Sequence, residues 1–150
     1  MRNWIIFIFL ALIGVSNAFA GGKRALLIGI SDYPKHSASE LTWNPIHGLN
    51  DVELIKGTLR KQGFTITTLT NAKATAVKIR SAFKRLIDEC RPGDMVYIHF
   101  SGHGQAYEDL SGDEADGWDE AIVPYDAMLQ YKRGCVVIQF YGAASLFVAL

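Results

Sequence analysis

Short apolar runs alternate with helix-like segments along the middle of the chain. Residues 24–30 (RALLIGI) and residues 95–100 (MVYIHF) are nearly continuous apolar runs, whereas residues 64–69 alternate apolar and polar positions. Runs of this length, rich in β-branched and aromatic residues, predict strands. The two continuous runs predict strands that are buried on both faces.

Two segments between these runs repeat their apolar residues at spacings of three and four. The first extends from Asn50 or Asp51, either of which can cap a helix, to Gln62. The second opens at Thr75 and ends at Glu89, shortly before a Pro-Gly pair. Strands joined by helical crossovers predict an α/β fold, a three-layer sandwich with a mostly parallel central sheet.

The pattern degrades after Asp126. Residues 136–141 can form a fourth strand, but residues 142–150 are an apolar end with no charge and no capping residue. We interpret residues 21–128 as one domain whose sheet is incomplete at its C-terminal side. Residues 129–150 are then an aberrant segment, produced by truncation or by a change of reading frame.

The first twenty residues have the order of a secretory signal peptide. Arg2 gives a positive start, residues 4–15 are apolar, and Ala18 and Ala20 form an Ala-x-Ala end. This apolar stretch is shorter than the ~20 residues that a spanning helix needs. We therefore predict cleavage after Ala20 and a secreted or periplasmic protein without a membrane anchor; an uncleaved anchor is the alternative.

Composition excludes several classes of protein. The chain has 150 residues, enough for one domain, and a formal net charge of zero with 20% charged residues. It therefore lacks the basic footprint of a nucleic-acid or anionic-membrane partner. Its two cysteines, Cys90 and Cys135, can pair in an oxidising compartment, but neither lies in a zinc-binding pattern. Nothing in the sequence fixes the oligomeric state.

A histidine between two glycines follows the third predicted strand. His103 and Gly104 come directly after Ser101-Gly102, and ligands of open parallel sheets bind just past the carboxyl ends of strands. An imidazole there can move protons near neutral pH, and the Gly104 amide can stabilise an oxyanion. The alternative is a turn in which His103 only covers the sheet edge. We interpret His99, inside the strand, as a half-buried residue behind the site.

An acidic segment comes next. Six acidic residues lie between Asp109 and Glu120. Calcium, which takes six to eight oxygen ligands, suits such a segment, although the spacing does not match an EF-hand. A solvated acidic loop is the alternative.

Four blocks in one order carry a family resemblance. They are KRALLIGISDYP at the first strand, IHGLNDVELIKGTL at the first helix, YIHFSGHGQ at the third strand and GDEADGWDEAIVPYDA after it. Together they resemble the caspase/metacaspase-like cysteine peptidases, over most of that family's large-subunit half. The resemblance implies an α/β sandwich in which a histidine and a cysteine at neighbouring strand ends form a catalytic dyad.

The resemblance also implies roles for individual residues. His103 matches the catalytic histidine, and Gly104 matches the position whose amide contributes to the oxyanion hole. Asp51 matches an acidic residue that lines the pocket for the residue before the cut bond, which implies cleavage of polypeptides after Lys or Arg. No cofactor is required. Calcium remains possible, and the candidates to contribute to its site are Asp113, Asp116 and Asp119, although the later Asp pair of the family's site is missing.

The largest departure from the family concerns the nucleophile. The family's cysteine follows its histidine by about fifty residues, whereas Cys135 follows His103 by 32 positions and lacks the surrounding motif. Cys90 lies at the end of the second predicted helix. We therefore predict a cysteine endopeptidase by family whose chain is inactive because the nucleophile segment is missing. The alternatives are a non-catalytic module that binds peptide or calcium, and a degraded product that does not fold.

Overall fold

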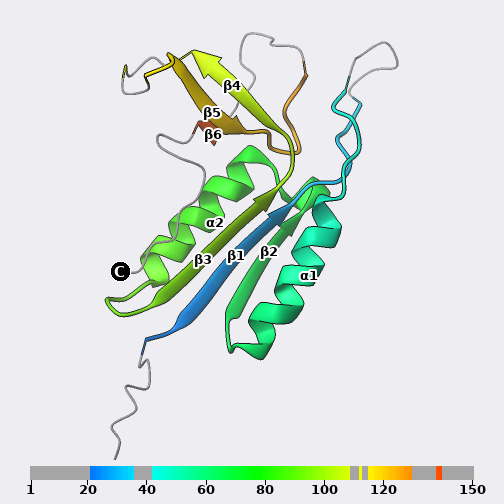
Figure 1. The fold of residues 1–150 in the computed structure, drawn as a ribbon. Coiled ribbons are helices and arrows are strands. Elements are labelled where there is room, and N and C mark those ends of the chain that lie inside the picture. The colour runs from blue at the N-terminus through cyan, green and yellow to red at the C-terminus, as the bar shows by residue number, and fades with distance from the viewer. Residues whose placement is uncertain (1–20, 36–41, 109–111, 113–114, 130–137, 140–150) are drawn as a thin grey trace, which may run out of the picture.

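A three-stranded parallel sheet with one helix on each face forms the body of the molecule (Figure 1). The computed structural model describes residues 21–35, 42–108, 112, 115–129 and 138–139. The central strand is β1 (Lys23–Gly29), with β2 (Thr65–Thr70) on one side and β3 (Met95–Ser101) on the other. Helix α1 (Gly48–Lys61) and helix α2 (Ala76–Glu89) are the crossovers, and a short 3-10 helix, η1 (Asn71–Lys73), follows β2. The predicted α/β class is therefore confirmed.

The alternating side chains of β1 build the two layers of the core. Leu26 and Ile28 face α2, where they pack with Ile79. Leu27 points to the opposite face and packs against Val52 of α1. All five side chains are at most 1% exposed. A strand that is apolar on both faces must be covered on both faces, which is why the sequence of β1 reads as one apolar run.

The two helices begin by different means. The predicted start of α2 at Thr75 is confirmed, and Thr75 is its N-cap, because its hydroxyl accepts a hydrogen bond from the Lys78 amide at 3.4 Å. The prediction that Asn50 or Asp51 caps α1 is wrong, since this helix begins at Gly48 and its N-cap, His47, makes no side-chain cap hydrogen bond.

Contacts with other parts of the fold place the start of α1 at Gly48, before the candidate capping residues Asn50 and Asp51. Gly48 packs so closely against β3 that an added Cβ would lie 2.4 Å from the Ser101 carbonyl oxygen. The amide of Leu49 donates to the Ser31 hydroxyl at 3.0 Å. The start of the helix is thus held by the loop after β1 and by the end of β3.

A second sheet, which the sequence analysis did not predict, continues from β3. Strands β4 (Gly104–Glu108), β5 (Trp118–Ile122) and β6 (Ile138–Gln139) pair antiparallel in the order β4-β5-β6. The acidic segment therefore lies between two paired strands, and its end, from Trp118, belongs to β5. The fourth strand predicted over residues 136–141 corresponds to β6, which joins this second sheet, and its remaining residues lie outside the described part.

An aspartate fixes the end of the sheet where β1 and β3 begin. Asp94 is only 5% exposed. It accepts hydrogen bonds from the Gly22 amide at 2.6 Å, from the Arg91 amide at 3.1 Å and from Nε of Arg24 at 3.4 Å. The bonds from Arg91 and Gly22, assisted by Arg24, lower the pKa of this carboxyl against the opposing effect of burial.

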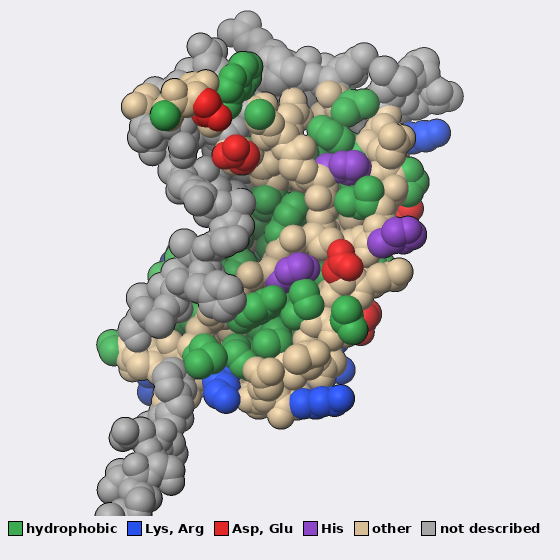
Figure 2. Space-filling view, in the orientation of Figure 1, with side chains coloured by type: hydrophobic (Ala, Val, Ile, Leu, Met, Phe, Trp, Pro, Cys, Tyr) green, Lys and Arg blue, Asp and Glu red, His purple; other side chains and the backbone are tan. Residues whose placement is uncertain are grey.

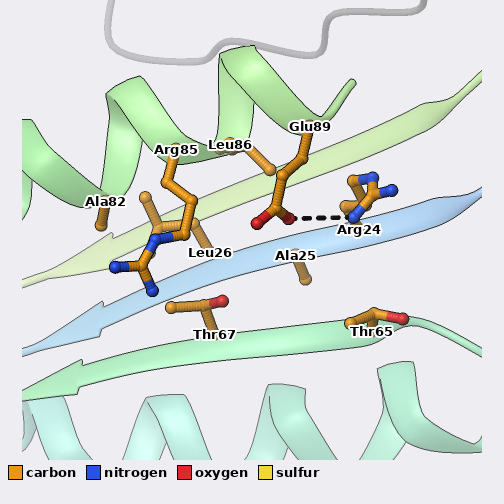
Figure 3. A pocket seen from close by; sticks show the side chains of 9 residues that line it. All are labelled: Arg24, Ala25, Leu26, Thr65, Thr67, Ala82, Arg85, Leu86 and Glu89. Atoms are coloured by element: carbon orange, nitrogen blue, oxygen red, sulfur yellow. Dashed lines mark hydrogen bonds and ion pairs between the residues drawn. The ribbon is translucent and has the colours of Figure 1, made fainter. Parts of the chain in front are cut away.

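Arg24 also pairs with Glu89 of α2 at 3.1 Å, beside a small groove (Figure 3). The groove measures about 30 Å³, which is room for about one or two water molecules. It is lined by Arg24, Ala25, Leu26, Thr65, Thr67, Ala82, Arg85, Leu86 and Glu89.

Several expected features fall outside the described residues. They include the expected signal peptide at 1–20, Cys135 and most of the segment 129–150. Within the described part, no helix has the length and apolar character needed to cross a bilayer.

Candidate active site

His103 lies where β3 ends and β4 begins, at the carboxyl edge of the parallel sheet (Figure 1). Its backbone is held on both sides, since its amide donates to the Tyr33 hydroxyl at 3.0 Å and its carbonyl accepts from the Val123 amide at 2.9 Å. The side chain is half-buried. His103 was predicted at this edge from the sequence, and the backbone contacts explain how the position is maintained.

The imidazole ring has a defined orientation. Its Nε2 lies 2.7 Å from the carbonyl oxygen of Asn44. A carbonyl oxygen only accepts, so Nε2 carries the hydrogen and Nδ1 of the neutral ring keeps its lone pair. The rings of Trp43 and Tyr33 lie 5.1 Å and 5.3 Å away, centroid to centroid, and limit rotation. The arrangement leaves a proton acceptor, Nδ1, available.

Tyr33 is the buried support of this histidine. Its side chain is 7% exposed, and burial raises its pKa to about 12, although the hydrogen bond with the His103 backbone opposes that rise. The hydroxyl therefore keeps its proton, which it donates to the Val123 carbonyl at 3.1 Å. One hydroxyl thus joins the backbones on both sides of the β4–β5 hairpin.

The loop that carries Tyr33, Trp43 and Asn44 is tied down at Ser31. The Ser31 amide donates to Oδ1 of Asn71 at 2.8 Å, and its carbonyl accepts from the Ile46 amide at 2.9 Å. These bonds join the two ends of the loop to each other and to the end of β2. The three residues next to His103 therefore come from one anchored loop.

The Gly104 amide faces away from its neighbouring strand. Gly104 stands opposite Ile122 in the β4–β5 ladder, and the bond from the Val123 amide to the His103 carbonyl makes this a non-hydrogen-bonded pair. In such a pair the two residues exchange no N–H···O bonds, and their N–H groups point away from the partner strand. The N–H of Gly104 therefore points away from β5. An amide in this position, next to the imidazole, can donate to a negatively charged oxygen.

Asp51 and Ser101 meet on the α1 side of the same edge. The Ser101 hydroxyl donates to Oδ2 of Asp51 at 2.6 Å. Asp51 lies in the first turn of α1 and is exposed. Asp51 was a candidate from the sequence, whereas Ser101 was missed, although its place two positions before His103 could have pointed to it.

His99 lies behind this pair and remains neutral near neutral pH. Burial lowers the pKa of its imidazole, and the opposing charge of Asp51 raises it by less. Its Nε2 is buried and makes no hydrogen bond within the described part of the chain. The expectation of a half-buried residue behind the site is therefore confirmed. Histidine and acidic side chains lie close together among apolar ones on the face seen in Figure 2.

The predicted calcium ligands are not brought together in the described residues. Asp116 accepts a hydrogen bond from the Trp118 amide at 3.1 Å. Asp113 and the side chain of Asp119 lie outside the described part. Among the described residues, no group of three or more His, Cys, Asp or Glu side chains is arranged to hold a metal ion. The calcium site stays a prediction.

The described cysteine is far from His103. Cys90 follows α2, before β3 begins, whereas His103 follows the end of β3. The seven residues of β3 separate the two ends, a distance of about 20 Å at the usual rise per residue. Burial also raises the pKa of the Cys90 thiol, against the effect of Arg24. Cys90 is therefore not placed to serve as a nucleophile for this histidine.

Replacing Tyr33 with Phe tests the support of His103. The change removes one hydroxyl and leaves the His103 amide without its acceptor. We expect amide hydrogen exchange at His103 and Val123 to accelerate about fivefold, because a net hydrogen bond contributes about 1 kcal/mol. Tyr125→Phe is the matched control, since Tyr125 packs against the same core cluster. Equal exchange in both variants would show that the hydroxyl does not hold the site.

Comparisons with known proteins identify the family of this chain. The family model for the metacaspase peptidase C14 domain matches residues 23–137. The chain is 31% identical over 110 residues to metacaspase-1 of Schizosaccharomyces pombe, covering 71% of this chain and 26% of that protein. It is 35% identical over 116 residues to metacaspase-2 of Arabidopsis thaliana, again with 71% of this chain and 26% of the relative covered.

A solved structure shares the fold. A crystal structure of a protein from Geobacter sulfurreducens superposes with a TM-score of 0.56 and 31% sequence identity, over 72% of this chain and 41% of the other. The chain spans about a quarter of the length of the curated relatives it matches. The matched region contains every residue of the site described above, and the chain belongs to the metacaspase family of cysteine peptidases.

Proposed function

We propose that His103 is the general base of a cysteine-type endopeptidase. The observation that carries this proposal is the contact between Nε2 and the Asn44 carbonyl at 2.7 Å, which leaves Nδ1 as the acceptor. Nδ1 takes the proton of a cysteine thiol, and the thiolate attacks the carbonyl carbon of the substrate. The imidazolium then gives this proton to the leaving amine. Water hydrolyses the resulting thioester and regenerates the thiol.

Gly104 stabilises the charged intermediate in this scheme. Thiolate attack places a negative charge on the former carbonyl oxygen of the substrate. The ladder register that turns the Gly104 amide away from β5 supports a hydrogen bond to that oxygen. Because Gly104 follows His103 directly, base and oxyanion donor stand on the same turn of backbone.

The nucleophile belongs at the open edge of β3. Among the described residues, β3 pairs only with β1. A parallel strand added to its other edge would end beside His103, where a cysteine would lie within reach of Nδ1. Cys90 lies at the other end of the sheet. Cys135 follows the end of β5 by only 13 positions, too few for a helical crossover and a further strand. We therefore propose that this chain does not cut peptides alone.

Asp51 directs the peptidase to basic residues. Its carboxylate is exposed and oriented by Ser101 at 2.6 Å. His99, the neighbouring imidazole, is neutral near neutral pH, so it does not compensate the carboxylate charge. A cationic side chain can supply that compensation. We propose that Lys or Arg precedes the cut bond.

Two further proposals come from the sequence. The expected signal peptide implies that the polypeptide substrates are met outside the cytoplasm, and the acidic residues between Asp109 and Glu120 imply that calcium binds this segment.

A turnover assay tests the assignment of the base. The purified chain, offered fluorogenic peptides ending in Arg or Lys with and without calcium, is expected to release no more fluorophore than the His103→Ala variant. A longer form of the peptidase that includes a nucleophile segment should lose turnover when it carries His103→Ala. Turnover that persists after His103→Ala would refute the base. Turnover that disappears with Cys135→Ala would refute the inactivity of this chain.

A binding experiment tests the role of Asp51 without catalysis. A short peptide ending in Arg, titrated into the chain and followed by NMR, should bind about tenfold or more weakly to Asp51→Asn, because a hydrogen bond to a charged group contributes about 1.5–3 kcal/mol. Glu53→Gln is the control, since Glu53 is an exposed acid of the same helix that pairs with Lys56 at 2.8 Å. Equal weakening by both variants would indicate a nonspecific charge effect.

A further inference from the structure

We propose that the chain is cut between Ala20 and Gly21, and that the new α-ammonium of Gly21 docks against Asp94 and the carbonyl of Gly93. The site lies where β1 and β3 begin, at the opposite end of the sheet from His103 (Figure 1). The cleavage and the docking do not depend on the proposed peptidase function.

The residues just after the expected cut are fixed in place. The Gly22 amide donates to Oδ1 of Asp94 at 2.6 Å, and the Gly22 carbonyl accepts from the Met95 amide at 2.8 Å. Lys23 then starts β1 in register with Met95. The sheet therefore begins at Lys23, the third residue after the expected cleavage site, and the fixed Gly22 restricts where Gly21 can lie.

Gly21 itself lies against the turn before β3. A Cβ added to it would stand 1.7 Å from the carbonyl oxygen of Gly93, so no larger residue fits this backbone path. Gly22 is also close, since its added Cβ would lie 3.2 Å from Oδ1 of Asp94. The Gly-Gly pair after Ala20 is thus accounted for by packing in the folded protein.

Cleavage changes the charge at this spot. A host signal peptidase adds water to the peptide bond, which leaves a carboxylate on Ala20 and an ammonium group on Gly21. The Gly21 nitrogen lies within about 3.6 Å of the Gly22 nitrogen by covalent geometry, and hence within about 6 Å of Oδ1 of Asp94. Opposite charges at this separation attract measurably.

Asp94 has capacity for this additional donor. Oδ1 accepts from the Gly22 amide, whereas Oδ2 accepts from Arg91 and Arg24. A carboxylate oxygen can accept two hydrogen bonds. Arg24 also pairs with Glu89 at 3.1 Å, so its positive charge is divided between two carboxylates and compensates that of Asp94 only in part. The Asp94 carboxylate and the Gly93 carbonyl together form an acceptor site for an ammonium group.

The test uses the exported protein and a variant that carries one extra glycine after Ala20. The extra residue keeps the ammonium charge but moves it outward by one residue. We expect mass spectrometry to show that the cleaved wild-type protein starts at Gly21. Asp94→Asn should lower the folding equilibrium constant of the cleaved wild-type protein about two- to fivefold more than that of the extended product. The difference is modest because the Gly21 end of the pair is half-exposed. Asp88→Asn, which removes an exposed carboxylate paired with Lys84 at 2.8 Å, should affect both products equally.

Three outcomes would overturn the proposal in different ways. A product that begins at another residue would remove the cleavage site. An equal effect of Asp94→Asn in both products would remove the docking, whatever the peptidase assays show. Gly21→Ala gives a second check, because it should abolish the difference between the products. Its control is Gly57→Ala, at a helix position with nothing within 4 Å of the added Cβ; a difference that survives Gly21→Ala would also contradict the docking.

Discussion

The carbonyl oxygen of Asn44 determines which nitrogen of His103 can act as a base. It lies 2.7 Å from Nε2 and, as an acceptor, requires the hydrogen to be there. The other contacts of the site preserve this arrangement. The Tyr33 hydroxyl holds the His103 backbone, Trp43 limits ring rotation, and Ser31 anchors the loop that carries Asn44. Without this loop, His103 would be an imidazole at a sheet edge with either tautomer accessible.

Elements with strong periodicity were predictable from the sequence. The buried run of β1, the Thr75 cap of α2 and the place of His103 past β3 all follow from local patterns. The start of α1 did not, because a close approach of Gly48 to the Ser101 carbonyl overrides the capping preference of Asn50 and Asp51. The β4–β5 hairpin was not predicted, because the acidic residues between and within its strands are typical of a solvated loop.

The partners of His103 were not predictable for a different reason. Tyr33 and Asn44 lie 70 and 59 positions away in the chain, and only the parallel order of β1 and β3 brings them together. No local pattern marks a backbone carbonyl as a ligand. The two ends of the sheet are held by similar means, with Tyr33 bridging backbones at the carboxyl end and Asp94 bridging them at the other.

The most direct measurement is the tautomer of His103, read from the ¹⁵N chemical shifts of its ring in the intact chain at a pH where the ring is neutral. The contact with Asn44 requires a protonated Nε2 and a lone pair on Nδ1. If the shifts instead show the hydrogen on Nδ1, or an equal mixture of the two forms, the imidazole is not oriented as a base for a thiol and the proposed mechanism fails.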